Sequence, residues 1–209
     1  MTCVDLTLHE SHEEHLRLLM SRSDGSEAAA YILFGVSEIT RDPWTGRRRL
    51  RLISHEVVPI PVEDMISADA AHVSWRTHSF VALIARAKRE GFVPAIVHTH
   101  PNGPADFSKQ DDHNERDLHQ LVVNRNGPNM LLASLLFSGG TTWSGRLWMD
   151  RGTPISFDHV SVVGHHFRQN RLPVPGEVSN DALDRQVRMF GPAKTNLLRS
   201  LRIAVVGCG

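Results

Sequence analysis

Hydrophobic and polar residues alternate with the period of a strand in some segments of the chain and with the period of a helix in others. The order of these segments predicts helices separated by groups of strands. Period-two alternation and short apolar runs predict strands over residues 4–8, 28–36, 47–58, 94–97, 131–137, 142–148 and 156–163. Apolar residues at helical spacing predict helices from residue 11, over 79–88 and over about 108–125. The last three strands follow one another as a meander. With no regular strand–helix–strand alternation, we expect an α+β fold, a mixed and mainly antiparallel sheet flanked by helices.

Local signals predict where individual helices begin and end. Ser11 with Glu14 fits a capping box at the start of the first helix, and Gly91 ends the second helix. Ser108 and Asp111 have the same spacing at the start of the third helix. A structural explanation of Ser108 is therefore that it caps this helix.

The segment from His165 to Gly176 contains two prolines and a glycine close together, which marks a domain boundary. Beyond it, the pattern predicts helices over 180–187 and 193–201 and an apolar strand over 203–206. That strand runs into Gly207-Cys208-Gly209, and a Gly-x-Gly turn after a strand is typical of the opening of a nucleotide site. We therefore predict a first domain over 1–165 and a second over 166–209. The second is a helical linker with a truncated Rossmann-type strand.

Composition narrows the class of protein. The chain has 209 residues and no formal net charge, and 41% of its residues are hydrophobic and 22% charged, as in ordinary globular domains. The balanced charge gives no reason to expect nucleic acid or an anionic membrane as a partner. Two cysteines form no disulfide framework, and neither a signal peptide nor an apolar run of the ~20 residues needed to span a membrane is visible. We expect a cytoplasmic protein.

The strongest candidate for chemistry is His98-Thr99-His100, at the end of the strand over 94–97. Residues i and i+2 of a strand point to the same face, so both imidazoles can bind one ion. Asp111 follows a loop of Asn, Gly and Pro residues, which can bring its carboxylate beside them. Two nitrogens and one oxygen leave a fourth tetrahedral position open, as in catalytic zinc sites. Taken alone, the His-x-His pair is better explained by two histidines at the end of a strand that bind no metal.

The full pattern is much more specific than the histidine pair. The motif resembles that of the JAMM or MPN-type (JAB) zinc metalloproteases, which include deubiquitinating isopeptidases. The matching residues, with the same intervals between them, are His98, His100, Pro101, Ser108 and Asp111. The resemblance covers about the first three quarters of the chain. It implies a cytidine-deaminase-like MPN architecture, one catalytic zinc on the two histidines and Asp111, and a ubiquitin-like protein or its conjugates as partner.

The resemblance also implies roles for Glu27 and Ser108. Glu27 precedes the strand over 28–36, where the family carries a glutamate, and would take a proton from the attacking water as general base. Asp106 and Asp112 are its rivals, and Glu27 could instead be an exposed acid. The Ser108 hydroxyl would help to polarise the scissile carbonyl oxygen.

The end of the chain resembles the entry of the adenylating domains related to ubiquitin-activating enzymes. An Arg-Gln pair at 185–186 precedes a helix, and Gly207 and Gly209 would begin an ATP loop. ATP would then bind only in a domain beyond these residues. Arg185 either reaches a nucleotide phosphate in a neighbouring protomer or is a surface charge. The C-terminal part could form a homodimer.

Together these features predict a zinc-dependent peptidase or isopeptidase. It would hydrolyse the amide bond after the C-terminal glycine of a ubiquitin-like protein, in maturation or deconjugation. Two alternatives remain, a catalytically silent MPN scaffold and a zinc hydrolase of a sulfur-carrier pathway. Other notable residues have structural explanations: strand packing for Thr99, small-residue packing for Cys208, solvated linker positions for His165 and His166, and core or rim positions for Trp75, Trp143 and Trp148.

Overall fold

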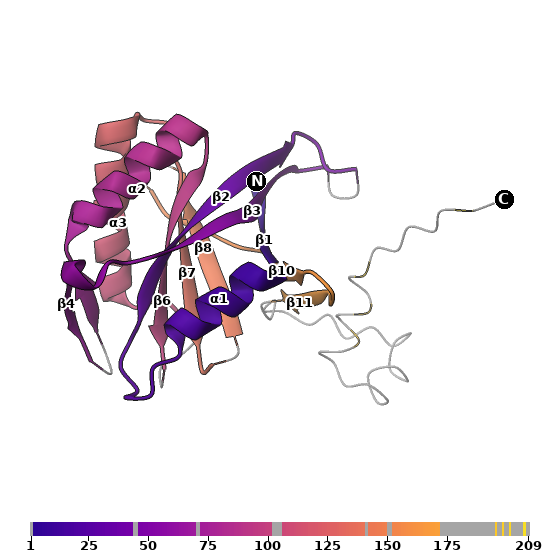
Figure 1. Ribbon diagram of the computed structural model, residues 1–209. Helices are drawn as coiled ribbons and strands as arrows, with labels where there is room; N and C mark the ends of the chain where they lie inside the picture. The colour runs from indigo at the N-terminus through magenta and orange to yellow at the C-terminus, as the bar shows by residue number, and fades with distance from the viewer. Residues whose placement is uncertain are drawn as a thin grey trace. The chain divides into compact units, whose positions relative to one another are not determined.

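The protein is represented by a computed structural model, which describes residues 2–43, 46–69, 72–101, 106–140, 142–149 and 152–171, together with Thr195, Leu198, Leu201 and Gly207. The helices are α1 (Glu10–Met20), α2 (Thr77–Glu90), α3 (Lys109–Asn126) and the short 3-10 helix η1 (Val62–Asp64). The strands are β1 (Thr2–His9), β2 (Ala29–Ile39), β3 (Arg48–Pro59), β4 (Met65–Ala68), β5 (Val73–Trp75), β6 (Val93–His100), β7 (Leu132–Ser138), β8 (Thr142–Trp148), β9 (Ile155–Ser156), β10 (His159–Val163) and β11 (Arg168–Arg171). Figure 1 labels most of these elements.

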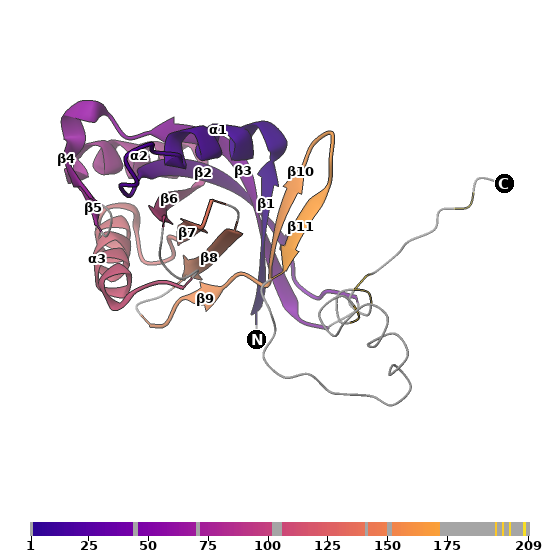
Figure 2. The ribbon, with the colours of Figure 1, turned by 90° about the horizontal axis from the view of Figure 1, so that it is seen from below.

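Most strands belong to one curled sheet. Within the described residues its order is β11-β10-β1-β3-β2-β6-β7-β8-β9, while β4 and β5 form a separate antiparallel pair. Strand β1 runs parallel to β3 and β10, and β6 runs parallel to β7, whereas the other neighbours are antiparallel. Figure 2 shows β10 and β11 beside β1. The predicted α+β class, with a mixed and mainly antiparallel sheet, is confirmed.

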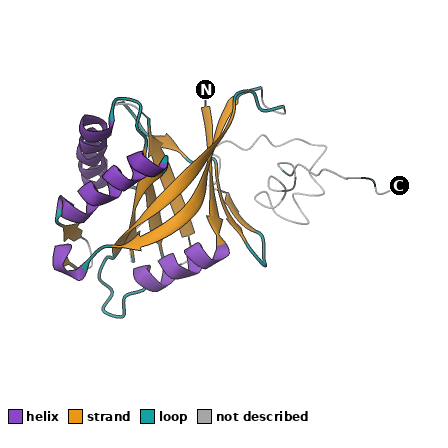
Figure 3. Ribbon diagram, turned by 45° about the horizontal axis from the view of Figure 1, so that its top comes forward, coloured by secondary structure: helices purple, strands orange, loops and turns teal. Residues whose placement is uncertain are grey.

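Helices pack on both faces of the sheet, and each face has its own apolar core. Helix α1 packs over β1, β2, β3 and β10, where its Leu16 is fully buried. Helices α2 and α3 pack against each other on the other face, over β6 and β7 (Figure 3). In the central strand β2, Ile32 belongs to the first core and Leu33 to the second. Burial on both faces explains why this strand is a continuous apolar run.

The first helix begins earlier than the predicted capping box. Helix α1 starts at Glu10, and His9 is its N-cap, with Nδ1 accepting a hydrogen bond from the Ser11 N–H at 3.3 Å. The capping box of Ser11 and Glu14 is therefore wrong. Because β1 runs directly into α1 without a loop, the cap comes two residues earlier than the Ser-x-x-Glu pattern suggests.

The predicted meander is right for the first pair of strands and wrong for the third strand. Strands β7 and β8 are antiparallel neighbours and β9 pairs with β8, but β10 joins the sheet beside β1. The Phe157 ring occupies the space over Gly145, where an added Cβ would lie 2.5 Å from it. The Asp158 N–H then donates to the Val4 carbonyl at 2.7 Å. These contacts lead the chain away from β8 and towards β1.

The chain divides into two compact units, Met1–Arg171 and Leu172–Gly209. Strand β11 pairs with β10, so the sheet of the first unit continues past the predicted boundary at 165. Arg168 also donates to the buried carboxylate of Glu13 at 3.1 Å. Most of the second unit lies outside the described residues, including the predicted helix at 180–187, the strand at 203–206, Arg185, Cys208 and Gly209. The two-domain division and the adenylating resemblance therefore stay predictions.

None of the helices in the described part of the chain is long and apolar enough to cross a membrane.

Candidate metal centre

Strand β6 presents both histidines on the same side of the sheet. Val97 belongs to the core beneath α1, while Ile96 belongs to the core beneath α2 and α3. His98 and His100 continue the even-numbered face of Ile96, as the alternation of side chains along a strand predicts. The two rings lie 5.1 Å apart between centroids, and His98 is 7% exposed.

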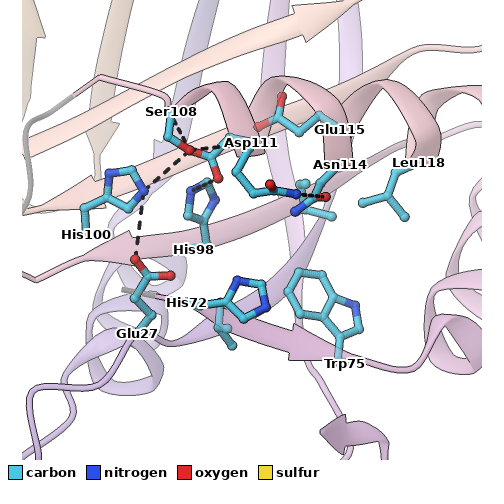
Figure 4. Close-up of a pocket in the computed structure, with 13 residues that line it drawn as sticks. Glu27, His72, Trp75, His98, His100, Ser108, Asp111, Asn114, Glu115 and Leu118 are labelled. Carbon is cyan, nitrogen blue, oxygen red and sulfur yellow. Dashed lines mark hydrogen bonds and ion pairs between the residues drawn. The ribbon is translucent and has the colours of Figure 1, made fainter. Parts of the chain in front are cut away.

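Asp111 is brought to the histidines by the first turn of α3. The Asp111 N–H donates to the Ser108 hydroxyl at 3.1 Å, and the Ser108 N–H donates to Oδ2 of Asp111 at 2.7 Å, which completes a capping box. The Asp111 Oδ1 lies 3.3 Å from Nε2 of His98, and Oδ2 lies 3.5 Å from Nε2 of His100 (Figure 4). The capping role of Ser108 is thus observed, and it also orients the carboxylate of Asp111.

These three side chains fit a zinc ion. One potential ligand atom from each of His98, His100 and Asp111 lies within 4.8 Å of the other two. Neighbouring ligand atoms of a tetrahedral zinc ion lie about 3.3–3.4 Å apart, given bonds of ~2.0–2.1 Å. The Nε2 of His98 is buried and, despite its short distance to Asp111, makes no hydrogen bond of ordinary geometry within the described residues. Such a nitrogen is costly to bury unpaired, and a metal ion would satisfy it.

Glu27 lies across from this trio, in the segment before β2. The register of β2 and β6 pairs Ala29 with His98, and two further steps along it bring Glu27 opposite His100. Its Oε1 is 4.0 Å from Nε2 of His100, and the side chain is buried, not exposed. Glu27 therefore lies beside the histidines, while its role as base stays a prediction.

Thr99 does more than pack between the two histidines. Its hydroxyl accepts a hydrogen bond from the Ala28 N–H at 2.8 Å, and its own N–H donates to the Ala28 carbonyl at 3.1 Å. The Glu27 N–H in turn donates to the carbonyl of Asp69 at 2.6 Å. These bonds hold the backbone beside Glu27, so the strand that carries the histidines also positions the glutamate.

The two carboxyl groups of the site have pKa values that are shifted in opposite directions. Burial raises the pKa of Glu27, and the nearby charges of His100 and His98 offset this effect only in part. Burial acts in the same sense on Asp111. However, the close approach and charge of His98, with the hydrogen bonds from Ser108, hold the Asp111 pKa well below its usual range. Asp111 is thus suited to be an anionic ligand, and Glu27 to exchange a proton.

Glu27, the two histidines, Ser108 and Asp111 line one end of a cleft of about 370 Å³. The cleft extends away from the histidines between β5 and α3. Trp75 of β5 and His72, which directly precedes β5, lie on one wall and face Asn114 and Leu118 of α3 (Figure 4). The pattern of the sequence did not predict the β4–β5 hairpin, which is short and lies outside the main sheet. Trp75 is half-buried on the rim, whereas Trp143 and Trp148 are fully buried.

The rivals of Glu27 do not reach the histidines. Asp112 points to the sheet, where its Oδ1 accepts a hydrogen bond from Arg146 at 2.5 Å. Asp106 is exposed and does not line the cleft. His165 and His166 are exposed, as expected.

One comparison with known proteins matches the part of the chain that carries the site. The model of the family described as "Prokaryotic homologs of the JAB domain" matches residues 9–145. This range includes the candidate metal ligands and catalytic residues, namely Glu27, His98, His100, Ser108 and Asp111. Among solved structures, one match is a solution structure of protein DSY2949 from Desulfitobacterium hafniense, with 17% sequence identity and a TM-score of 0.45. That match covers 76% of this chain and 92% of the other chain. A comparison with curated proteins gave no significant match.

Proposed function

Because the chain belongs to the family of prokaryotic homologs of the JAB domain, we propose that it is a zinc-dependent peptidase. Its substrate would be the amide bond that follows the C-terminal glycine of a ubiquitin-like protein. The observation that carries the proposal is the meeting of His98, His100 and Asp111 with Glu27 in one cleft. Three ligands and a separate carboxylate are the parts of a hydrolytic zinc site.

His98, His100 and Asp111 would hold the zinc. Bound there, zinc supplies Lewis acidity, which lowers the pKa of water towards ~7 and polarises a carbonyl group. Glu27 takes the proton of the attacking water on a carboxylate oxygen and returns it to the nitrogen of the leaving amine. Because Glu27 is 7% exposed, bulk water has little access to compete for that proton.

Ser108 can serve both of its predicted roles. A hydroxyl has one donor and two acceptor positions, and the capping bond from the Asp111 N–H uses one acceptor only. The O–H of Ser108, which lines the cleft, also bonds to the Asp111 carboxylate and would turn from it to donate to the scissile carbonyl oxygen.

The substrate class rests on the family and on the predicted adenylating segment at the end of the chain. A protein with both activities would mature or release a ubiquitin-like modifier and also activate it. The adenylating part and any homodimer contact through it belong to the proposal.

A cleavage assay tests the proposal. Zinc-loaded protein is incubated with ubiquitin-like proteins that carry a peptide beyond their C-terminal Gly-Gly, and with Gly-Gly-linked fluorogenic peptides. We expect intact-mass analysis to show loss of the extension, and no loss with Glu27→Gln or after chelation of zinc. Zinc-loaded protein that cuts none of these above the Glu27→Gln rate would support a silent scaffold. Cleavage of small cysteine-containing peptides alone would support the sulfur-carrier alternative.

A further inference from the structure

Arg146 of β8 lies outside the cleft but contacts the helix that carries Asp111. Its side chain is 7% exposed. The Nε–H donates to Oε2 of Glu115 at 2.7 Å, and Nη1 donates to Oδ1 of Asp112 at 2.5 Å. One guanidinium therefore bonds to two carboxylates in the first two turns of α3, and one of them belongs to the residue next to Asp111.

The same guanidinium also contacts the loop before α3. Its Cζ lies 3.9 Å from the centroid of the Phe107 ring, and Phe107 is the residue before Ser108. The Phe107 ring in turn lies 6.0 Å from the ring of His98. Arg146 thus contacts the chain on both sides of the capping box, and Phe107 connects it to one of the two histidines.

Arg146 adds directional contacts to the apolar packing of helix α3. The buried residues of α3 are Glu115, His119 and Val122, of which only the last is apolar, and Leu118 and Leu121 pack against the second core while partly exposed. Apolar contact is non-directional, so it tolerates small rotations and shifts of a helix. A planar guanidinium with hydrogen bonds to two carboxylates permits far less movement. The Trp148 Nε1–H also donates to Oε2 of Glu115 at 2.7 Å, which fixes that carboxylate from the same strand.

We propose that Arg146 is a positioning residue for the metal centre, which holds Asp111 against the two histidines through Asp112, Glu115 and Phe107. The inference rests on the proposed function, because it assumes that these ligands bind zinc. Groups that orient metal ligands without touching the metal typically change its affinity by 10–100-fold.

Arg49 of β3 offers a matched control. Its Nη1 donates to Oδ2 of Asp5 at 2.7 Å, and its Nε lies 3.1 Å from Oδ2 of Asp42. Arg49 therefore also pairs with two largely buried carboxylates, but it lies two strands away from β6 and does not line the cleft. Replacing it removes comparable ion pairs without touching α3.

The test is zinc affinity, measured by competition with a chromogenic chelator for the wild type, Arg146→Met, Arg146→Lys and Arg49→Met. The visible spectrum of each cobalt(II)-loaded protein and the melting of each zinc-free protein are recorded in parallel. We expect Arg146→Met to bind zinc at least ~10-fold more weakly and to alter the cobalt bands, with Arg146→Lys intermediate. Arg49→Met should melt earlier, yet keep zinc affinity within about twofold of the wild type and leave the cobalt bands unchanged.

Two results would overturn the inference. One is wild-type zinc affinity in Arg146→Met, or in Arg146→Lys if the methionine variant does not fold. The other is an equal loss of affinity in Arg49→Met, since the effect would then follow from lost stability. A wild-type protein that binds no zinc would instead overturn the proposed function, so the two failures are distinguishable.

Discussion

Replacing Ser108 separates its capping role from its predicted role in catalysis. Alanine removes the acceptor of the 3.1 Å bond from the Asp111 N–H but leaves the 2.7 Å bond from the Ser108 N–H to Asp111. Loss of a cap costs about 1 kcal/mol, and because Ser108 is exposed, water can replace the lost partner, so we expect about 0.5–1 kcal/mol. For a chain of this length, that lowers the melting temperature by roughly 1–4 °C.

The rate should fall far more than the stability. Loss of one donor to the carbonyl oxygen slows turnover ~100-fold, which corresponds to about 2.7 kcal/mol. Glycine is nearly as good a cap as serine, within a few tenths of a kcal/mol, so Ser108→Gly should melt almost normally and still lose ~100-fold in kcat. The assay is kcat on any substrate that the wild type cleaves, together with thermal melting and zinc content.

A control variant removes a cap elsewhere. His9→Ala deletes the N-cap acceptor of α1, which lies on the other face of the sheet from α3. It should lower the melting temperature without changing kcat. If Ser108→Ala and Ser108→Gly both cleave within about threefold of the wild type, Ser108 is a helix cap only and has no part in the chemistry.

Four further results are expected. Glu27→Gln should keep one zinc per chain by atomic spectroscopy but lose on the order of 100-fold in kcat, and loss of zinc would instead make this residue a ligand. Asp111→Ala should lose zinc to a chelator more readily than any Ser108 variant, because it removes both a proposed zinc ligand and the capping-box carboxylate. Burial acts to raise the pKa of Asp5, but His159 and Arg49 outweigh this effect, so the net shift lowers the pKa. The ionised carboxylate of Asp5 therefore stabilises the fold at pH values above its unfolded pKa of ~3.9. The gap in melting temperature between the wild type and Asp5→Asn should therefore shrink as the pH falls from 7 to about 3, and a constant gap would contradict the assignment. Chains ending at residue 171 should retain zinc binding, whereas chains ending at 165 should melt earlier because they lack β11, and equal melting would show that β11 is dispensable.

The parts of the site that depend on local geometry could be predicted from the sequence. His98 and His100 share a face because of the period of a strand, and Asp111 occupies a defined position in the first turn of a helix. Glu27 is different, because nothing near it in sequence links it to the histidines. Its position follows from the register of β2 and β6, and only the family resemblance identified it.

The parts that depend on distant contacts were missed. Residue Arg146 is 31 positions from Glu115, and its burial gives no signal in the local pattern. The crossing of β10 to β1 depends on Phe157 filling the space over Gly145, which pairs two residues from different elements. For Thr99 the sequence indicates only strand packing, because the partner of its hydroxyl is the backbone of Ala28, 71 positions away.

The most direct test of the central claim is a crystal structure of zinc-loaded protein with diffraction recorded at the zinc absorption edge. We expect one anomalous peak at bonding distance, about 2.0–2.2 Å, from Nε2 of His98, Nε2 of His100 and one carboxylate oxygen of Asp111, with Glu27 close by but not bonded to it. A zinc ion bound elsewhere, or one that takes Glu27 in place of Asp111 as ligand, would contradict the account.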